Sequence, residues 1–162
     1  MLDAVPVELV QMVEQAAHVH ELDPNLVKSI ITVESNWNPK VSRFEPGWTY
    51  FHFPREWASR LGITAKTEET LQSMSIGLMQ IMGAVAREVG FTGNLSDLFF
   101  PRENLIYGCR KLKRLTQKYG DESDVISSYN QGSPRKTEGG QYRNMLYVDK
   151  VSTVLRSLRA LK

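Results

Sequence analysis

Apolar residues recur every three or four positions along most of the chain, which is the spacing of one face of an α-helix. The alternation of apolar and polar residues that is typical of strands is not evident. The sequence therefore predicts an all-α fold, with room for a small hairpin in the irregular stretch 41–74. Helices are expected over 6–19, 54–61, 67–74, 101–119, 125–130 and 142–161, from 24 to shortly before 38, and from an opening within 75–83 to a stop at 90.

Short polar side chains mark the expected helix starts, because their oxygens accept hydrogen bonds from the free backbone amides of the first turn. Asp23, Thr67 and Asp124 are expected to cap the helices that follow them. Gly62 is expected to end the helix before it, since glycine adopts the left-handed conformation common at helix ends.

One of these helices presents a carboxylic acid on its apolar face. Glu34 continues the stripe of Ile30 and Ile31, so its side chain is expected to face the core. It also lies near the negative end of the helix dipole, because Asn38-Pro39 disfavours continuation. Partial burial and the dipole both favour the neutral form, which suits a general acid. The alternative is a carboxylate that reaches solvent past the helix end or pairs with an arginine.

Composition narrows the class of protein. The 162 residues, 41% of them hydrophobic and 23% charged, predict one globular domain over 1–162, expected to be a monomer. A net charge of +2 is too small to indicate nucleic acid as a partner. No signal peptide or membrane span is recognisable, so the protein is expected to be made in a cytoplasm, unless a leader was left off. Neither the three histidines nor Cys109, expected to be a buried thiol, has ligand spacing, so no metal or cofactor is expected.

The stretch 41–74 is unusually rich in aromatic residues. Trp48, Tyr50, Phe51 and Phe53 fall within six positions of one another. They are expected to form either a small core of their own or a wall on which sugar rings stack, since their rings offer flat apolar faces beside polar edges.

Four stretches, taken in order, carry a resemblance to a known family. They are 34–39 (ESNWNP), 77–82 (GLMQIM), 104–108 (NLIYG) and 127–132 (SSYNQG). Together they resemble the soluble lytic transglycosylases, which share a lysozyme-like helical fold with goose-type lysozyme. The resemblance implies an enzyme whose partner is peptidoglycan and which cleaves the MurNAc-GlcNAc β-1,4 bond. The insertion 41–74 and the missing leader look more like phage-encoded members than bacterial envelope ones. A phage-encoded member is expected to be made in the host cytoplasm and to act on the cell wall, released at lysis or carried by the virion; the alternative is an envelope enzyme without its leader.

The resemblance also implies roles for single residues. Glu34 resembles the catalytic acid and Tyr129 a residue that faces it. In this family one carboxylate suffices: the acid protonates the glycosidic oxygen, the substrate's acetamido group stabilises the positive charge, and the same residue then takes a proton from the C6 hydroxyl, leaving a 1,6-anhydro end. The residues implied at the site are Glu34, Ser35, Met79, Gln80, Tyr129 and Asn130, with Glu45 and Trp48 as further candidates from the insertion.

Two departures from the family pattern bear on these roles. Small residues common around the tyrosine are replaced by Ser127, Ser128 and Gln131, which is expected to alter hydrogen bonding. The family's Glu-Thr pair before a Tyr-Val is absent before Tyr147, where Asn144 is one of the replacements, so a sugar contact there is in doubt.

Two other functions stay open from the sequence. A hydrolysing muramidase needs a second carboxylate, for which Glu45 is the candidate. The alternative for Glu45 is a salt bridge to Arg43 or Arg55. A noncatalytic glycan-binding or phage tail module would keep the fold without the reaction, although the intact Glu34 argues against it.

Overall fold

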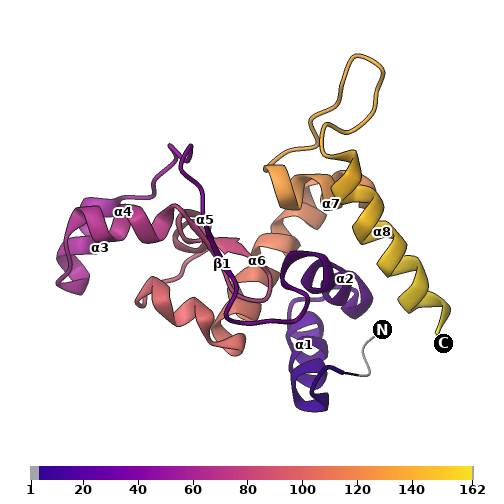
Figure 1. The fold of residues 1–162 in the computed structure, drawn as a ribbon, viewed down its shortest axis with the longest axis horizontal. Coiled ribbons are helices and arrows are strands. Elements are labelled where there is room, and N and C mark those ends of the chain that lie inside the picture. Colours follow the sequence, from indigo (N-terminus) through magenta and orange to yellow (C-terminus); the bar gives the residue numbers. More distant parts are fainter. Residues whose placement is uncertain (1–3, 162) are drawn as a thin grey trace. The chain divides into compact units, whose positions relative to one another are not determined.

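The computed structural model describes residues 4–161; the ends of the predicted domain, 1–3 and 162, lie outside the described residues. Within that range helices dominate, with three short strands, which confirms the predicted helical fold (Figure 1). The helices are α1 (Val7–Val19), α2 (Pro24–Ser35), α3 (Pro54–Leu61), α4 (Ala65–Gln72), α5 (Gly83–Glu88), α6 (Pro101–Lys118), α7 (Glu122–Gln131) and α8 (Met145–Ala160), with a 3₁₀ helix η1 (Leu95–Phe99). The strands are β1 (Ser42–Phe44), β2 (Met74–Ile76) and β3 (Ile81–Met82).

The chain forms two compact units. The helical unit comprises Met1–Glu34 and Cys109–Lys162, and the sheet unit comprises Ser35–Gly108. The prediction of a single domain stays a prediction.

The helical unit is built on apolar stripes that the sequence predicted. The side chains of Leu26, Val27, Ile30 and Ile31 on α2 and of Val148, Val151, Leu155 and Leu158 on α8 are buried. Asp23 caps α2 as expected, since its Oδ1 accepts a hydrogen bond from the backbone amide of Asn25 at 2.8 Å. No helix within 4–161 combines the length and the apolar character that crossing a membrane requires.

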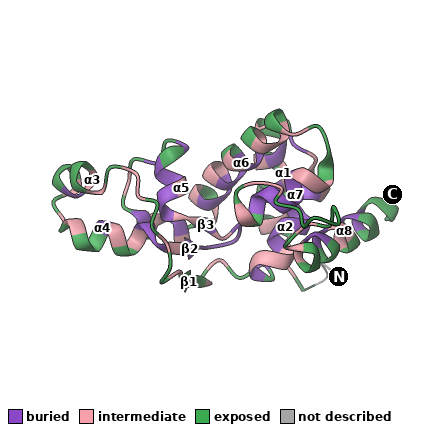
Figure 2. Cartoon of the chain, turned by 90° about the horizontal axis from the view of Figure 1, so that it is seen from above, coloured by how far each residue is buried: buried purple, intermediate pink, exposed green. Residues whose placement is uncertain are grey.

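The sheet unit contains an antiparallel sheet in the order β1-β2-β3. Phe44, the last residue of β1, pairs with Met74, the first of β2. The part of the aromatic insertion that lies between these two residues therefore begins and ends at neighbouring positions of the sheet. Between these points α3 and α4 pack against each other, and most of their residues are exposed or intermediate (Figure 2). An insertion with adjacent ends extends the unit without interrupting the pairing of β1 and β2.

The helix predicted to open within 75–83 begins only at Gly83, the last position of that range, because β2, a turn and β3 occupy the residues before it. Gly77 and Gln80 have positive φ angles of 74° and 45°, which no continuous α-helix contains. The apolar residues Ile76, Leu78, Met79 and Ile81 are all fully buried, and a continuous apolar run does not distinguish a short buried strand from a helix.

Two predicted helix caps are wrong, and both are displaced by the same amount. Thr64, not Thr67, caps α4, and Asp121, not Asp124, caps α7. In each helix the predicted residue lies three positions later and donates its backbone amide to the cap, at 3.0 Å in both cases. A polar residue at either position satisfies the local pattern, so the pattern alone did not identify the cap.

Candidate active site

Glu34 lies at the penultimate position of α2, and its side chain is partly buried. Tyr147 of α8 donates its phenolic hydroxyl to Glu34 Oε1 at 2.7 Å. The helix ends directly after the acid, since Asn36 and Trp37 both adopt left-handed conformations, with φ angles of 47° and 65°. The carboxylate is thereby held between the end of one helix and the hydroxyl of another.

Two phenols share the electrostatic environment of this carboxylate. Burial raises the pKa of Tyr129 well above its usual value, and the charge of Glu34 raises it further. Burial also raises the pKa of Tyr147, as do the charge of Glu34 and the hydrogen bond to it. Both hydroxyls therefore stay protonated at neutral pH and are available as hydrogen-bond donors. The structure thus adds Tyr147 to the expected pair of Glu34 and Tyr129.

Lys111 of α6 supplies a cation to the same group. Its Nζ donates to the backbone carbonyl of Tyr129 at 2.7 Å and lies 3.8 Å from the centroid of that ring. Burial lowers the pKa of Lys111 to about 8, while the Glu34 carboxylate opposes that shift. Sequence reasoning missed Lys111, because in the apolar pattern of α6 it is only one of several lysine and arginine residues outside the buried stripe.

Three of the residues that depart from the family pattern, Ser127, Gln131 and Asn144, are joined by hydrogen bonds. Ser127 Oγ donates to Asn144 Oδ1 at 2.8 Å, and Asn144 Nδ2 donates to the Ser127 carbonyl at 3.0 Å and to Asn130 Oδ1 at 3.1 Å. Gln131 Nε2 donates to Ser127 Oγ at 2.9 Å. These bonds connect the end of α7 to the residue that precedes α8, three positions before Tyr147. The substitutions therefore form a matched set that positions the start of α8.

Met79 and Gln80 lie in the turn between β2 and β3 of the sheet unit. Gln80 Nε2 donates to the carbonyls of Val41 and Gly77, both at 2.9 Å, and its Oε1 accepts from Ser75 Oγ at 3.0 Å. Met79 is fully buried. Both side chains therefore help to hold the turn, and their contact with a substrate stays a prediction.

Asn104 explains why the second and third of the resembling stretches occur together. Its Nδ2 donates to the carbonyls of Ile76 and Leu98 at 2.7 and 2.9 Å, and its Oδ1 accepts from the backbone amide of Met79 at 2.8 Å. A Cβ at Gly108 would lie 2.4 Å from Met79 Sδ, so only glycine allows this close approach. The stretch 104–108 thus braces the turn that carries Met79.

Glu45 and Trp48 also belong to the sheet unit. Arg43 Nε donates to Glu45 Oε1 at 2.6 Å, which corresponds to the structural alternative stated for this carboxylate. The Trp48 indole donates to the carbonyl of Tyr50, and the two rings meet edge to face at 6.2 Å. The predicted roles of Glu45 in hydrolysis and of Trp48 and Ser35 in binding stay predictions.

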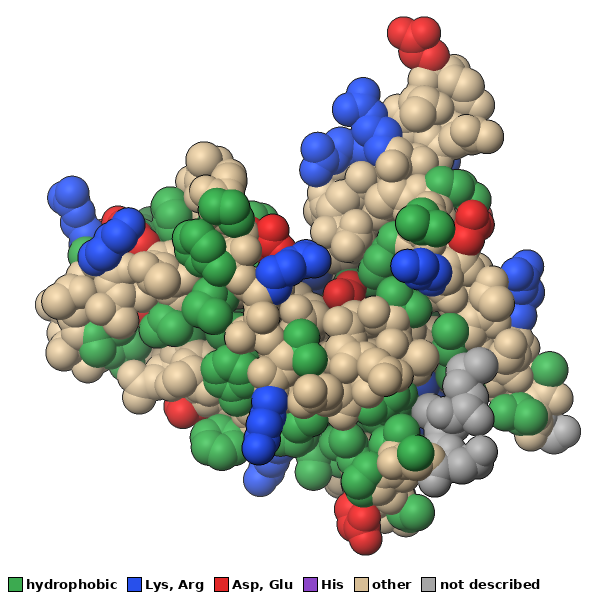
Figure 3. All heavy atoms as spheres, in the orientation of Figure 1, with side chains coloured by type: hydrophobic (Ala, Val, Ile, Leu, Met, Phe, Trp, Pro, Cys, Tyr) green, Lys and Arg blue, Asp and Glu red, His purple; other side chains and the backbone are tan. Residues whose placement is uncertain are grey.

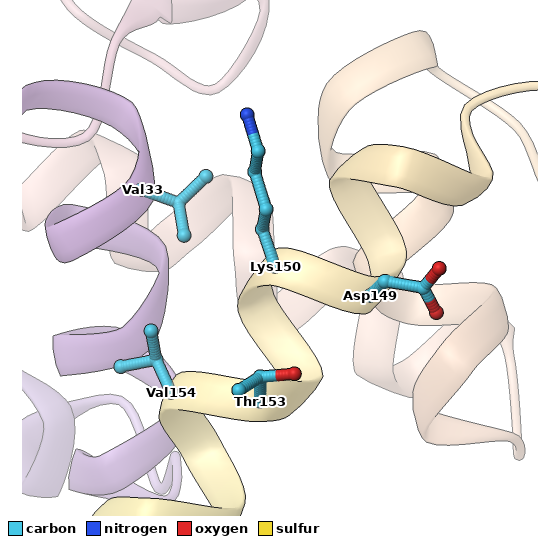
Figure 4. Close-up of a pocket in the computed structure, with 5 residues that line it drawn as sticks. All are labelled: Val33, Asp149, Lys150, Thr153 and Val154. Atoms are coloured by element: carbon cyan, nitrogen blue, oxygen red, sulfur yellow. The ribbon is translucent and has the colours of Figure 1, made fainter.

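A hollow of about 400 Å³ lies between α2 and α8 of the helical unit. It is lined by Val33, Asp149, Lys150, Thr153 and Val154 (Figure 4). Consecutive residues of a helix point about 100° apart, so Val33 faces a different side of α2 from its neighbour Glu34. Glu34 is not among the residues that line the hollow.

Metal ions are held in proteins by groups of acidic, histidine and cysteine side chains. Within the described residues no three such side chains lie together in a group that could hold an ion. Cys109 is buried, and burial raises the pKa of its thiol to about 12, as expected for a structural cysteine.

Comparison with known proteins defines the class. Residues 11–147 match the family model of the Transglycosylase SLT domain, and the chain belongs to this family. A similar protein is the one named Transglycosylase from Enterobacteria phage PRD1, which is 24% identical over 129 residues. The match covers 80% of this chain but 37% of that relative, so the chain spans little more than a third of its length. No solved structure matches significantly. The family predicted from the four stretches is thus confirmed.

Proposed function

We propose that this chain cleaves the MurNAc-GlcNAc β-1,4 bond of peptidoglycan without water and leaves a 1,6-anhydro-MurNAc end. The observation that carries the proposal is the hydrogen bond from Tyr147 to Glu34, at the end of an apolar helix in a member of the SLT family. The name of the phage relative, Transglycosylase, supports the same reaction class.

The reaction needs one residue to act twice. Protonated Glu34 gives its proton to the glycosidic oxygen as the bond from that oxygen to C1 of MurNAc breaks. The acetamido group of the substrate stabilises the charge that develops at C1. The Glu34 carboxylate then takes the proton of the C6 hydroxyl as O6 bonds to C1, so the acid is regenerated and no water is consumed.

The neighbours of Glu34 suit both halves of this cycle. The Tyr147 hydroxyl donates to Oε1, which helps to orient the carboxyl group. The charge of Lys111 favours the carboxylate that remains after the proton has been given away, whereas burial favours the neutral acid. Opposing influences of this kind suit a residue that acts first as an acid and then as a base.

Product analysis tests the proposal against hydrolysis. Digestion of purified peptidoglycan in ¹⁸O-labelled water should release muropeptides one water lighter than reducing sugars and free of label, and Glu45→Gln should keep this activity. Incorporated label, together with a Glu45→Gln defect as deep as that of Glu34→Gln, would instead establish a muramidase.

Replacement of the acid tests whether the chain is an enzyme at all. Glu34→Gln should lower the rate by at least about a thousandfold while the melting temperature stays close to that of the wild type. A wild-type protein that is no more active than Glu34→Gln would indicate a noncatalytic glycan-binding module.

A further inference from the structure

A buried ion pair lies inside the sheet unit, within and beside the aromatic insertion. Glu68 of α4 and Arg87 of α5 have fully buried side chains joined by two bonds of 2.8 and 3.1 Å. Arg87 also donates to the carbonyls of Phe91 and Gly93, and Glu68 accepts from Gln72 Nε2 at 2.9 Å. Charges buried with this many partners form a rigid arrangement, because the loss of any partner would leave an uncompensated charge.

This arrangement supports two aromatic residues at the surface. Gln72 holds the backbone of His52 on both sides, since its Oε1 accepts from the His52 amide at 2.7 Å and its Nε2 donates to the His52 carbonyl at 3.1 Å. Phe53 is the next residue along the chain. The Arg87 guanidinium lies 4.3 Å from the ring centroid of Trp57. Trp57 thus contacts one of the buried charges directly, and Phe53 is linked to the other through His52 and Gln72.

The backbone of Phe53 adopts a strained conformation. Its φ and ψ angles are 46° and 54°, the left-handed region in which a bulky side chain is rarely found. The ring is also 62% exposed, so it gains little from burial. Strained backbone conformations persist where surrounding contacts hold them, and they cluster at ligand-binding sites. An exposed aromatic side chain in such a conformation, held by a buried hydrogen-bond network, is therefore more typical of a ligand-binding residue than of a residue of the hydrophobic core.

Phe53 and Trp57 line a hollow of about 260 Å³ together with Glu56 and Arg60. Hydrophobic and charged side chains adjoin on the surface over α3 and α4 (Figure 3). The Arg60 guanidinium lies 5.3 Å from the centroid of the Trp57 ring. The hollow therefore combines two aromatic rings with one acceptor group and one donor group.

The charges of the hollow indicate the chemistry of its ligand. A simple anion would be repelled by Glu56 and a simple cation by Arg60, whereas a neutral ligand with several hydroxyl groups can donate to one and accept from the other. Its apolar face would stack on the rings. A sugar ring has both properties.

We propose that the hollow of Phe53, Glu56, Trp57 and Arg60 binds one N-acetylglucosamine ring of a glycan strand and takes no part in bond cleavage. The choice of peptidoglycan as the polymer rests on the proposed function. The contact anchors the enzyme on its substrate through the insertion, a segment that departs from the family's usual pattern.

Binding of a β-1,4-linked hexamer of N-acetylglucosamine tests the proposal. The titration uses the Glu34→Gln protein, so that turnover is blocked, and follows the indole N–H resonance of Trp57. That resonance should shift on binding, and Phe53→Ala should weaken affinity at least tenfold without lowering the melting temperature. Phe100→Ala is the matched control, because Phe100 is 63% exposed in the same unit but does not line the hollow. It should leave affinity unchanged.

Three results would overturn the assignment: no shift of the Trp57 indole, unchanged affinity in Phe53→Ala, or binding of muropeptides through their peptide stems without binding of the plain hexamer. Trp57→Phe provides a second variant with a stacking ring and should retain most of the affinity; a loss as deep as that of Phe53→Ala would also contradict stacking. None of these readouts depends on catalysis. Failure of the anhydro chemistry would appear in the product analysis, and failure of this site in the titration.

Discussion

Tyr147→Phe removes the hydroxyl that donates to Glu34 and keeps the aromatic ring of the side chain. The bond lost is 2.7 Å long and donates to the carboxylate oxygen Oε1. A hydrogen bond to a charged group contributes about 1.5–3 kcal/mol. Because one pKa unit corresponds to about 1.4 kcal/mol, its loss should raise the pKa of Glu34 by about one to two units.

The expected change in activity has two parts. The reaction starts from the protonated acid, so the alkaline limb of kcat/KM should move to higher pH by about the same one to two units. The maximal rate should fall by about ten- to a hundredfold, because the carboxylate that forms in the transition state loses the same bond. Release of soluble muropeptides from purified peptidoglycan, measured from about pH 4 to 9, gives both quantities.

Tyr142→Phe is the matched control. The Tyr142 hydroxyl donates to Asp124 Oδ1 at 2.6 Å. The variant therefore removes a hydrogen bond from a phenol to a carboxylate in the helical unit, as Tyr147→Phe does, but the carboxylate is not that of Glu34. The pH profile of this variant should coincide with that of the wild type. An alkaline limb that stays in place in Tyr147→Phe, or that moves equally in Tyr142→Phe, would refute the role given to Tyr147.

Three further variants test the site and its support. Lys111→Met should move the alkaline limb of activity to higher pH, because it removes the cation near Glu34. In the wild type the free energy of unfolding should rise from about pH 8 to 10.5, because in this range the unfolded protein keeps the Lys111 proton and the folded protein does not; Lys111→Met should abolish this rise. Lys113→Met on the same helix should change neither quantity. Ser128→Ala should raise the free energy of unfolding in urea by about 1 kcal/mol, because this buried hydroxyl has no hydrogen-bond partner among the described residues; a decrease would contradict this. Asn104→Ala should lower it by about 3 kcal/mol or more, since three buried backbone groups lose their partner, and a loss below about 1 kcal/mol would show that the turn does not depend on it.

The sequence alone determined those features of the fold that depend on residues close together in the chain, such as helix ends and apolar stripes. Helix α3 runs from Pro54 to Leu61 as predicted, because proline suits the first helical position and Gly62 adopts the left-handed conformation that ends the helix. The apolar stripe of α2 and the position of Glu34 at its end followed from helical periodicity in the same way.

Tertiary structure decided what depends on residues far apart in the chain. The hairpin of β2 and β3 occupies the residues where the first part of a helix was predicted, because its turn is held by Asn104, whose three bonds span 6 to 28 positions. Tyr147 reaches Glu34 from 113 positions away, and no local pattern of apolar and polar residues contains that distance. The sequence therefore pointed to the acid, whereas the groups that set its proton affinity emerged only when separate helices packed together, because electrostatic and hydrogen-bond partners are chosen by proximity in space.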